Sequence, residues 1–218
     1  MIGFIEGATG LKKALFIGYY GYWVALTYLS IISAVAGIYF AFSGEIKTAI
    51  LCMMFSGLCD TFDGRVASLK KRDSVQLSFG IQIDAMADLI SFGVLPAAML
   101  YSLGQSHGSF GIIDTVIPII YVLTAVIRLA YFNATEMEEK DENGKRAYYE
   151  GLTTTSVALI IPIMYSACNF FRISHFFVFS VMLAIISILF VLKMKIPKPK
   201  IKTQIILCLA GLFMTIIM

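Results

Sequence analysis

The sequence predicts an all-α polytopic membrane protein, and three observations support this fold class. Of its 218 residues, 59% are hydrophobic. Charged residues make up 14% of the chain, against roughly 25% in soluble domains. Several long stretches contain no charged residue and exceed the roughly 20 residues that a helix needs to cross a bilayer. The length suits six or seven crossings with short loops and leaves no room for a large soluble domain.

The first half of the chain supplies three of the predicted helices. Residues 14–44 carry no charge, and a first helix is expected near 20–42. A second apolar run begins at residue 48 and ends in a segment with two aspartates. A third helix is expected to begin near 76–79, to carry two more aspartates, and to continue through the charge-free residues 89–113.

The second half supplies three more helices, at about 114–133, 151–171 and 173–192. Residues 203–218 are apolar but short, and they are expected to form an additional C-terminal membrane helix. Residues 1–16 are amphipathic and are expected to lie along the lipid headgroups. The predicted organisation is therefore a juxtamembrane segment at 1–16, a six-helix transmembrane core at 17–195, and a basic loop with the additional helix at 196–218.

The distribution of basic residues predicts the orientation in the membrane. One side collects the Lys and Arg residues of the N-terminal segment and of the loops 64–78, 134–150 and 193–202. The loops of the other side contain Lys47 and Arg172. Because cytoplasmic loops are enriched in Lys and Arg, the N-terminus and the three basic loops are expected to face the cytoplasm. The sequence thus predicts a multi-pass protein of the cell membrane.

Four aspartates lie within predicted membrane helices, where charged side chains are costly and usually mark a functional site. Asp60 and Asp63 of the second helix are spaced i,i+3, and Asp84 and Asp88 of the third are spaced i,i+4. Each pair therefore shares one helix face. Both pairs lie toward the same membrane boundary, on either side of one loop, so two antiparallel helices would bring all four carboxylates together.

Four unpaired carboxylates in one apolar site would repel each other, and two arrangements relieve the repulsion. Two divalent cations such as Mg²⁺ would balance the charges, since hard cations prefer carboxylate oxygen. Alternatively, the carboxylates of a cation-coupled transporter would bind protons or sodium. Small residues favour the metal site, because Gly64 and Ala67 follow Asp60 on its face and Gly80 precedes Asp84 on its face. They leave room for a flat group such as a nucleotide, although they also permit close helix packing.

This pattern resembles the signature of the CDP-alcohol phosphotransferase family, D-x2-D-G-x2-A-R-x(7–12)-G-x3-D-x3-D. The segments DTFDGRVA (60–67) and GIQIDAMAD (80–88) match it, with Ser68 in the place of its arginine. The stretches FGIQIDAMADLISFGVLPA, RLAYFN and YEGLTTTSVA are further similar to the phosphatidylserine synthase branch of the family.

The resemblance implies a six-helix catalytic core, usually a homodimer, with an active site open to the cytoplasmic leaflet of the bilayer. The implied reaction transfers the phosphatidyl group of CDP-diacylglycerol to L-serine and releases CMP. The implied cofactors are two divalent cations, Mg²⁺ or Mn²⁺, and a nucleic-acid partner is not expected. The matching metal-binding positions are Asp60, Asp63, Asp84 and Asp88, with Asp88 as the general base, and Gly64, Ala67 and Gly80 join Asp63 in lining the CDP site.

Several basic residues are candidates for binding the anionic parts of the substrates. Lys70, Lys71 and Arg72 would sit beside the diphosphate, although the basic character of a cytoplasmic loop explains them equally well. Arg128, within the fourth helix, would bind the serine carboxylate. Arg65 lies three residues before Ser68, so it is the preferred substitute for the missing arginine, ahead of Lys70 and Arg72. Two other functions stay open. One is the same chemistry on another alcohol, such as glycerol 3-phosphate or inositol phosphate, and the other is the cation-coupled transporter.

Overall fold

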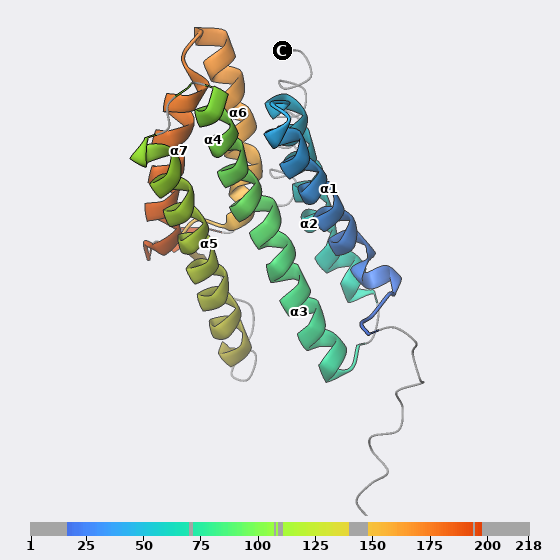
Figure 1. Cartoon of the computed structure of the whole chain (residues 1–218). Coiled ribbons are helices and arrows are strands. Elements are labelled where there is room, and N and C mark those ends of the chain that lie inside the picture. The colour runs from blue at the N-terminus through green and yellow to red at the C-terminus, as the bar shows by residue number, and fades with distance from the viewer. Residues whose placement is uncertain are drawn as a thin grey trace, which may run out of the picture.

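The computed structural model describes residues 17–69, 72–106, 108, 111–139, 148–193 and 195–197, and it confirms the predicted all-α class (Figure 1). The helical elements are α1 (Tyr22–Phe42), α2 (Ile46–Ser68), α3 (Ser74–Asp88), the π-helix η1 (Leu89–Val94), α4 (Leu95–Ser106), α5 (Ile112–Glu139), the 3₁₀-helix η2 (Thr154–Ser156), α6 (Val157–Phe171) and α7 (His175–Val191). A short antiparallel pairing of β1 (Tyr148–Glu150) with β2 (Lys195–Pro197) connects the segment before α6 to the segment after α7.

Six helical rods correspond to the six predicted crossings, because α3, η1 and α4 form one continuous helix. Some predicted bounds were wrong. The α3–α4 rod ends at Ser106 and α5 continues to Glu139. The fifth predicted helix begins at Val157 instead of residue 151, because Gly151 has a positive φ of 75° and a 3₁₀ turn intervenes. The predicted N-terminal amphipathic segment and the additional C-terminal helix lie outside the described residues.

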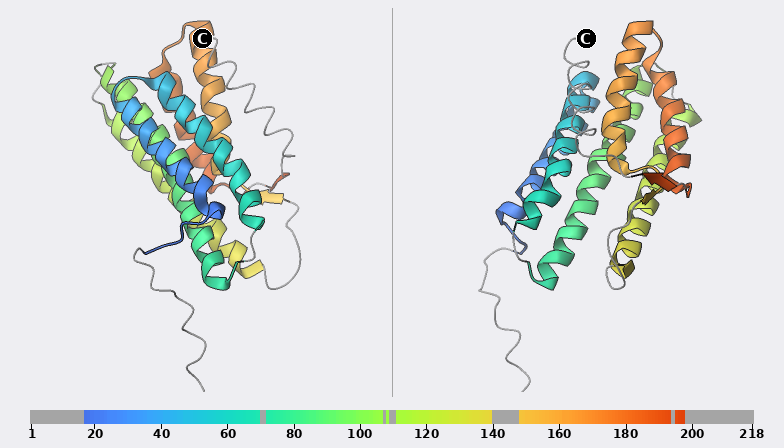
Figure 2. Two further views of the ribbon diagram at one scale, coloured as in Figure 1. Left: turned by 90° about the vertical axis from the view of Figure 1, so that its right-hand side faces the viewer. Right: turned by 180° about the vertical axis from the view of Figure 1, so that it is seen from behind.

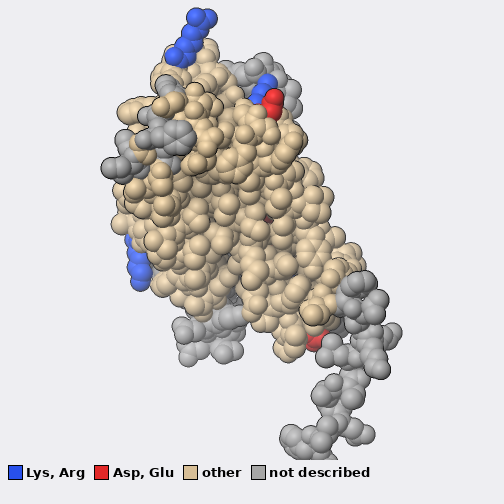
Figure 3. Space-filling model, viewed as in Figure 1, with Lys and Arg blue, Asp and Glu red and all other residues tan. Residues whose placement is uncertain are grey.

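The described chain has the surface of a multi-pass membrane protein. Four helical segments, Tyr22–Phe42, Ser74–Ser106, Thr115–Thr135 and Thr154–Phe171, are long and apolar enough to cross a bilayer. The helix α7 is apolar but shorter. On the face shown in Figure 3, the described surface between the two ends is almost free of charged side chains. Large apolar side chains of the described helices are exposed, as lipid contact requires, including Ile32, Ile119 and Ile188 at 65%, 61% and 63%.

The rod formed by α3, η1 and α4 runs through the middle of the bundle (Figures 1 and 2). The helices α1 and α2 lie on one side of it, and α5, α6 and α7 lie on the other. Phe92, Leu95 and Met99 of the rod are fully buried and belong to the main apolar core. A Cβ atom at Gly57 of α2 would lie 2.9 Å from the Cβ of Ala158, so α2 and α6 approach closely where both residues are small.

Three buried serines connect α1, α2 and η1 one helical turn from the acidic residues. The Ser30 and Ser56 hydroxyls are 2.5 Å apart, and Ser56 donates to Ser91 at 2.6 Å. A hydroxyl buried among apolar side chains is costly unless it is hydrogen-bonded, and this cluster satisfies all three together. Because Ser56 precedes Asp60 by four residues and Ser91 follows Asp88 by three, the cluster holds the two acidic helix segments at a defined spacing.

The π-helix η1 follows Asp88 directly. Pro96 has no N–H group, so the Phe92 carbonyl four residues earlier lacks its usual helical donor. The hydroxyl of Tyr121 on α5 donates to this carbonyl at 2.5 Å, and the Tyr121 side chain is fully buried. Turns of π-helix are frequent at functional sites. This turn sets the direction of the helix immediately after Asp88.

Replacing Tyr121 with Phe should therefore destabilise the fold. The expected loss in the free energy of unfolding is about 1–3 kcal/mol, because the buried Phe92 carbonyl would lose its donor. Denaturant unfolding of the purified protein in detergent measures this change. The variant Tyr101→Phe, at an exposed tyrosine of α4, is the control and should behave as the wild type. Equal stability of both variants would contradict this role for Tyr121.

Candidate functional site

The four predicted aspartates come together between α2 and α3. Oxygen atoms of Asp60, Asp63 and Asp84 all lie within 4.8 Å of one another. The carboxylate of Asp60 is the neighbour of that of Asp88, and the carboxylate of Asp63 is the neighbour of that of Asp84. The first acid of α2 thus faces the second acid of α3, and the second acid of α2 faces the first of α3. Two antiparallel helices with these spacings produce this pairing.

Two threonines from outside the acidic helices donate hydrogen bonds to the carboxylates. The Thr27 hydroxyl of α1 donates to Oδ2 of Asp63 at 3.3 Å, and the Thr154 hydroxyl of η2 donates to Oδ2 of Asp88 at 3.2 Å. Both threonines are 5% exposed. Sequence analysis did not single them out, because a lone Thr in an apolar run carries no signal and the run 153–155 contains three alternatives. Only the packing of α1 and η2 against the acidic helices identifies them.

A first cavity of about 170 Å³ opens on one side of the acids and is called here the small-residue cavity. It is lined by Trp23, Val24, Thr27, Asp63, Gly64, Ala67, Arg72, Gly80, Ile81, Ile83 and Asp84. The three predicted small residues all lie in this lining, as the sequence pattern indicated. A Cβ atom at Gly64 would meet nothing within 4 Å, so the space beside this residue is open to a ligand.

A second cavity of about 250 Å³, the polar cavity, opens on the other side of the acids. It is lined by Asp60, Ile81, Asp84, Ala85, Asp88, Arg128, Leu129, Phe132, Asn133, Thr153, Thr154 and Thr155. Ile81 and Asp84 line both cavities, so the two cavities adjoin at the acidic cluster. Arg128 is 8% exposed and is, among the described residues that line this cavity, its one Lys or Arg side chain.

The segment 151–154, which leads into η2, lies against both Arg128 and Asp88 of the polar cavity. A Cβ atom at Gly151 would lie 2.8 Å from Nη1 of Arg128 and 3.0 Å from the Leu192 carbonyl oxygen. Glycine is required here, because both the close contact and the positive φ exclude a side chain. Three residues later, Thr154 contacts Asp88. This one segment therefore sets the positions of Arg128 and Asp88 together.

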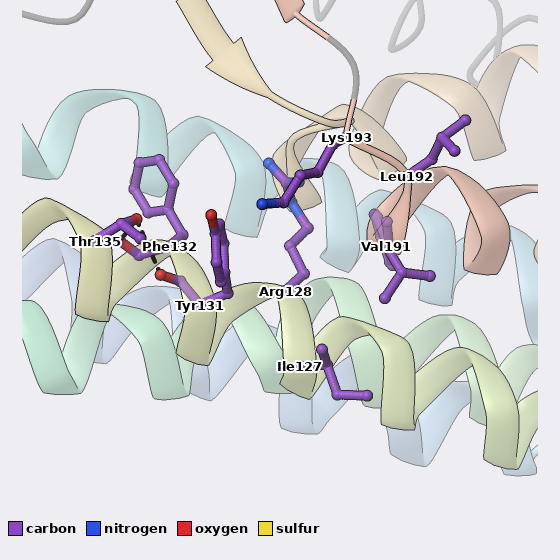
Figure 4. A pocket seen from close by; sticks show the side chains of 9 residues that line it. Ile127, Arg128, Tyr131, Phe132, Thr135, Val191, Leu192 and Lys193 are labelled. Carbon is purple, nitrogen blue, oxygen red and sulfur yellow. Dashed lines mark hydrogen bonds between the residues drawn. The ribbon is translucent and has the colours of Figure 1, made fainter.

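A lateral groove of about 130 Å³ lies between α5 and the end of α7 (Figure 4). It is lined by Ile127, Arg128, Tyr131, Phe132, Thr135, Phe190, Val191, Leu192 and Lys193, and it shares Arg128 and Phe132 with the polar cavity. The Lys193 ammonium lies 5.3 Å from the centre of the Tyr131 ring, a cation–π contact. The lining is mainly apolar and includes two cations, Arg128 and Lys193, which lie next to each other in Figure 4. Such a lining suits a lipid with a hydrocarbon chain and an anionic head.

The predicted cation Arg65 does not reach these cavities. It is exposed and does not line either cavity or the groove. Lys70 lies outside the described residues. The Ser68 hydroxyl, at the position of the signature arginine, donates to the Arg65 carbonyl of its own helix at 2.7 Å. The small-residue cavity contains Arg72, which sequence analysis ranked behind Arg65 as a substitute for the signature arginine.

A sequence model of the family described as CDP-alcohol phosphatidyltransferase matches residues 24–217. The chain belongs to the CDP-alcohol phosphatidyltransferase family. It is 39% identical over 113 residues to the CDP-diacylglycerol–serine O-phosphatidyltransferase of Saccharomyces cerevisiae, a match that covers 50% of this chain and 38% of the relative. It is 34% identical over 124 residues to the protein of the same name from Mycobacterium bovis, covering 57% of this chain and 40% of the relative.

The chain also resembles the archaetidylserine synthase of Methanothermobacter thermautotrophicus. The two are 31% identical over 134 residues, which cover 60% of this chain and 56% of the relative. The matched part of the chain spans about two-fifths of the length of the yeast and mycobacterial proteins.

The carboxylates of the acidic cluster fit the divalent cations that the family implies. Asp60, Asp63 and Asp84 converge, and Asp88 lines the polar cavity together with Asp60 and Asp84, so the available ligands are all oxygen atoms. Such ligands suit Mg²⁺ and Mn²⁺. Charge balance also favours bound divalent cations, because four carboxylates without a cation would repel each other in an apolar environment.

Removing one carboxylate should weaken metal binding. Asp60→Asn and Asp84→Asn each take away one negative charge and one strong ligand. Each should weaken Mn²⁺ binding by about tenfold or more, because an interaction with a charged group is worth about 1.5–3 kcal/mol. Isothermal titration of Mn²⁺ into the detergent-solubilised protein measures this. Glu45→Gln, at an exposed position before α2, is the control and should bind as the wild type. Unchanged affinity in both Asn variants would rule out a metal site at this cluster.

Proposed function

We propose that the protein transfers the phosphatidyl group of CDP-diacylglycerol to L-serine and releases CMP. The observation that carries this proposal is the acidic cluster between two cavities of different character. The family, and the printed names of the yeast and mycobacterial relatives, support the same reaction. The small-residue cavity would bind the cytidine diphosphate part of the donor, and the polar cavity would bind serine.

Each substrate matches its cavity by chemistry. Gly64, Ala67 and Gly80 leave room for a flat nucleotide beside the acids. In the polar cavity, the Arg128 guanidinium would bind the serine carboxylate, for which its planar donors are well suited. The lateral groove next to Arg128 would accommodate an acyl chain of the lipid.

The reaction replaces one phosphorus–oxygen bond with another. The serine hydroxyl oxygen attacks the phosphorus that carries the diacylglycerol, the bond from this phosphorus to the bridging oxygen breaks, and CMP leaves. The serine proton passes to Asp88 and then to solvent. Two divalent cations, Mg²⁺ or Mn²⁺, held by Asp60, Asp63, Asp84 and Asp88, would neutralise the diphosphate charge and polarise its phosphorus. Alignment and charge neutralisation are what phosphoryl transfer mainly requires of an enzyme.

Asp88 is the best placed of the four acids to act as the base. It lines the polar cavity together with Arg128, so a serine bound through its carboxylate would present its hydroxyl toward Asp88. The Thr154 hydroxyl contacts Oδ2 and so orients the carboxylate. A base needs this position within hydrogen-bonding reach of the proton that it removes.

In the proposed function, the acidic cluster of the enzyme opens toward the cytoplasm. The enzyme is proposed to act as a homodimer in the cell membrane. The excess of Lys and Arg in the loops 64–78, 134–150 and 193–202 supports the orientation. The orientation is tested by introducing a cysteine at Asp73 and treating intact cells with a thiol reagent that cannot cross the membrane. A cytoplasmic cysteine should not be labelled until the cells are opened.

Serine should be the accepted alcohol. Among the described residues of the polar cavity, the single cation suits one carboxylate, whereas glycerol 3-phosphate or inositol phosphate would bring a doubly charged phosphate. The measurement is CMP release from CDP-diacylglycerol by the purified protein with each acceptor in turn. If glycerol 3-phosphate or inositol phosphate supports release and serine does not, the acceptor assignment is wrong. If no alcohol supports CMP release and the protein instead transports protons or sodium, the protein is a cation-coupled transporter and the proposed transferase reaction is wrong.

Asp88→Asn should remove turnover more completely than it removes donor binding. The amide keeps the shape of the side chain and an oxygen for Thr154, but it cannot accept the serine proton. The expected loss in kcat is about 10²-fold or more, as for other general bases. Binding of CDP with Mn²⁺, measured by calorimetry, should change much less than kcat. A loss of CDP affinity as large as the loss of kcat would indicate a metal-binding role alone.

A further inference from the structure

The end of α2 lacks the cation that the family signature places there. Ser68 is exposed, and its hydroxyl is hydrogen-bonded to the Arg65 carbonyl at 2.7 Å, within the same helix. A hydroxyl used in this way offers nothing to a ligand in the small-residue cavity. The phosphates of a nucleotide in that cavity would therefore need a cation from another part of the chain.

Arg72 enters the small-residue cavity from the connection between α2 and α3. Its guanidinium carbon lies 5.5 Å from the centre of the Trp23 ring, within cation–π range. Trp23 is 2% exposed, and its ring packs against the rings of Tyr19 and Phe79 at 5.9 and 6.4 Å between ring centres. A guanidinium that stacks on a fixed ring keeps its N–H edge available for an anion. Trp23 thus holds Arg72 in position.

Gly80 gives a second, independent indication of how Arg72 is placed. A Cβ atom at residue 80 would lie 3.0 Å from Nη1 of Arg72 and 3.5 Å from the Trp23 ring. The absence of a side chain at Gly80 is therefore what admits the guanidinium to the cavity. Arg72 reaches the same cavity as Asp63 and Asp84, whereas the side chain of Arg65 is exposed elsewhere on α2.

We propose that Arg72 binds the diphosphate of the nucleotide-linked donor and replaces the cation that is missing at Ser68. The proposal rests on the proposed function in one respect, that the small-residue cavity is the donor site. Arg72 would neutralise the phosphates from one side, opposite the acids and their divalent cations. A guanidinium can make two parallel hydrogen bonds to a phosphate, which a serine hydroxyl cannot. Arg72 is thereby a determinant of donor affinity that acts independently of the acceptor.

Calorimetric binding of CDP in the presence of Mn²⁺ tests this assignment directly. Arg72→Ala should weaken CDP binding by about 10- to 150-fold, the range for losing a charged hydrogen-bonding group. Arg72→Lys should fall between the wild type and Arg72→Ala, because it keeps the charge and loses the planar fork. The combination Ser68→Arg with Arg72→Ala should recover most of the lost affinity. Arg172→Ala, at an exposed arginine after α6, is the matched control and should bind CDP as the wild type.

Two results would overturn the proposal. One is CDP affinity of Arg72→Ala within twofold of the wild type. The other is a weakened Arg72→Ala variant that Ser68→Arg does not improve, which would show that the two positions do not share a role. Mn²⁺ affinity of each variant should stay at the wild-type value, which separates a lost phosphate contact from a misfolded site. Serine-dependent CMP release by the wild type is measured alongside, so failure of the acceptor assignment would appear there and leave the CDP result intact.

Discussion

Mutual repulsion of four carboxylates is the constraint on which the structure of this protein depends. In a bundle surrounded by lipid, such charges are poorly screened and strongly disfavoured without cations. The helices must nevertheless keep Asp60, Asp63, Asp84 and Asp88 close enough to share ligands. The fold meets this requirement with hydroxyl groups at the borders of the cluster. Thr27 and Thr154 donate to two of the carboxylates, and a serine cluster connects the same helices one turn further into the core.

The central rod combines rigidity with a local change of helical pitch at the site. Pro96 removes one donor from the helix, and the Tyr121 hydroxyl of a different helix replaces it at the Phe92 carbonyl. The resulting π-helix begins immediately after Asp88, so the last acidic residue lies where the helix changes its geometry. Packing of α5 against the rod thereby contributes to the geometry of the site without any contact between Tyr121 and the acids.

The two cavities divide the chemistry of the proposed reaction between different parts of the chain. The donor side is built from the small residues of α2 and α3, with Trp23 and Arg72 at its border. The acceptor side is built from α5 and from the segment around η2, and Gly151 allows that segment to close on Arg128. Changes on one side can thus alter affinity for one substrate while the acidic cluster stays intact. This separation is suited to a family whose members use different alcohols.

The sequence by itself determined the all-α membrane fold, the six helices and the acidic cluster, because hydropathy and helical spacing are local properties of the chain. Four aspartates at i,i+3 and i,i+4 spacing in apolar helices can meet only if the helices lie side by side. The tertiary structure decided which hydroxyls and cations surround them. Thr27 and Thr154 reach the site from α1 and η2, and no local pattern encodes those approaches. Arg72 was one of several basic residues expected near the diphosphate, and the packing of its connection against Trp23 decides that it enters the cavity. Arg65 was preferred because spacing along one helix was the available guide, whereas the direction of a side chain at a helix end depends on its neighbours in space.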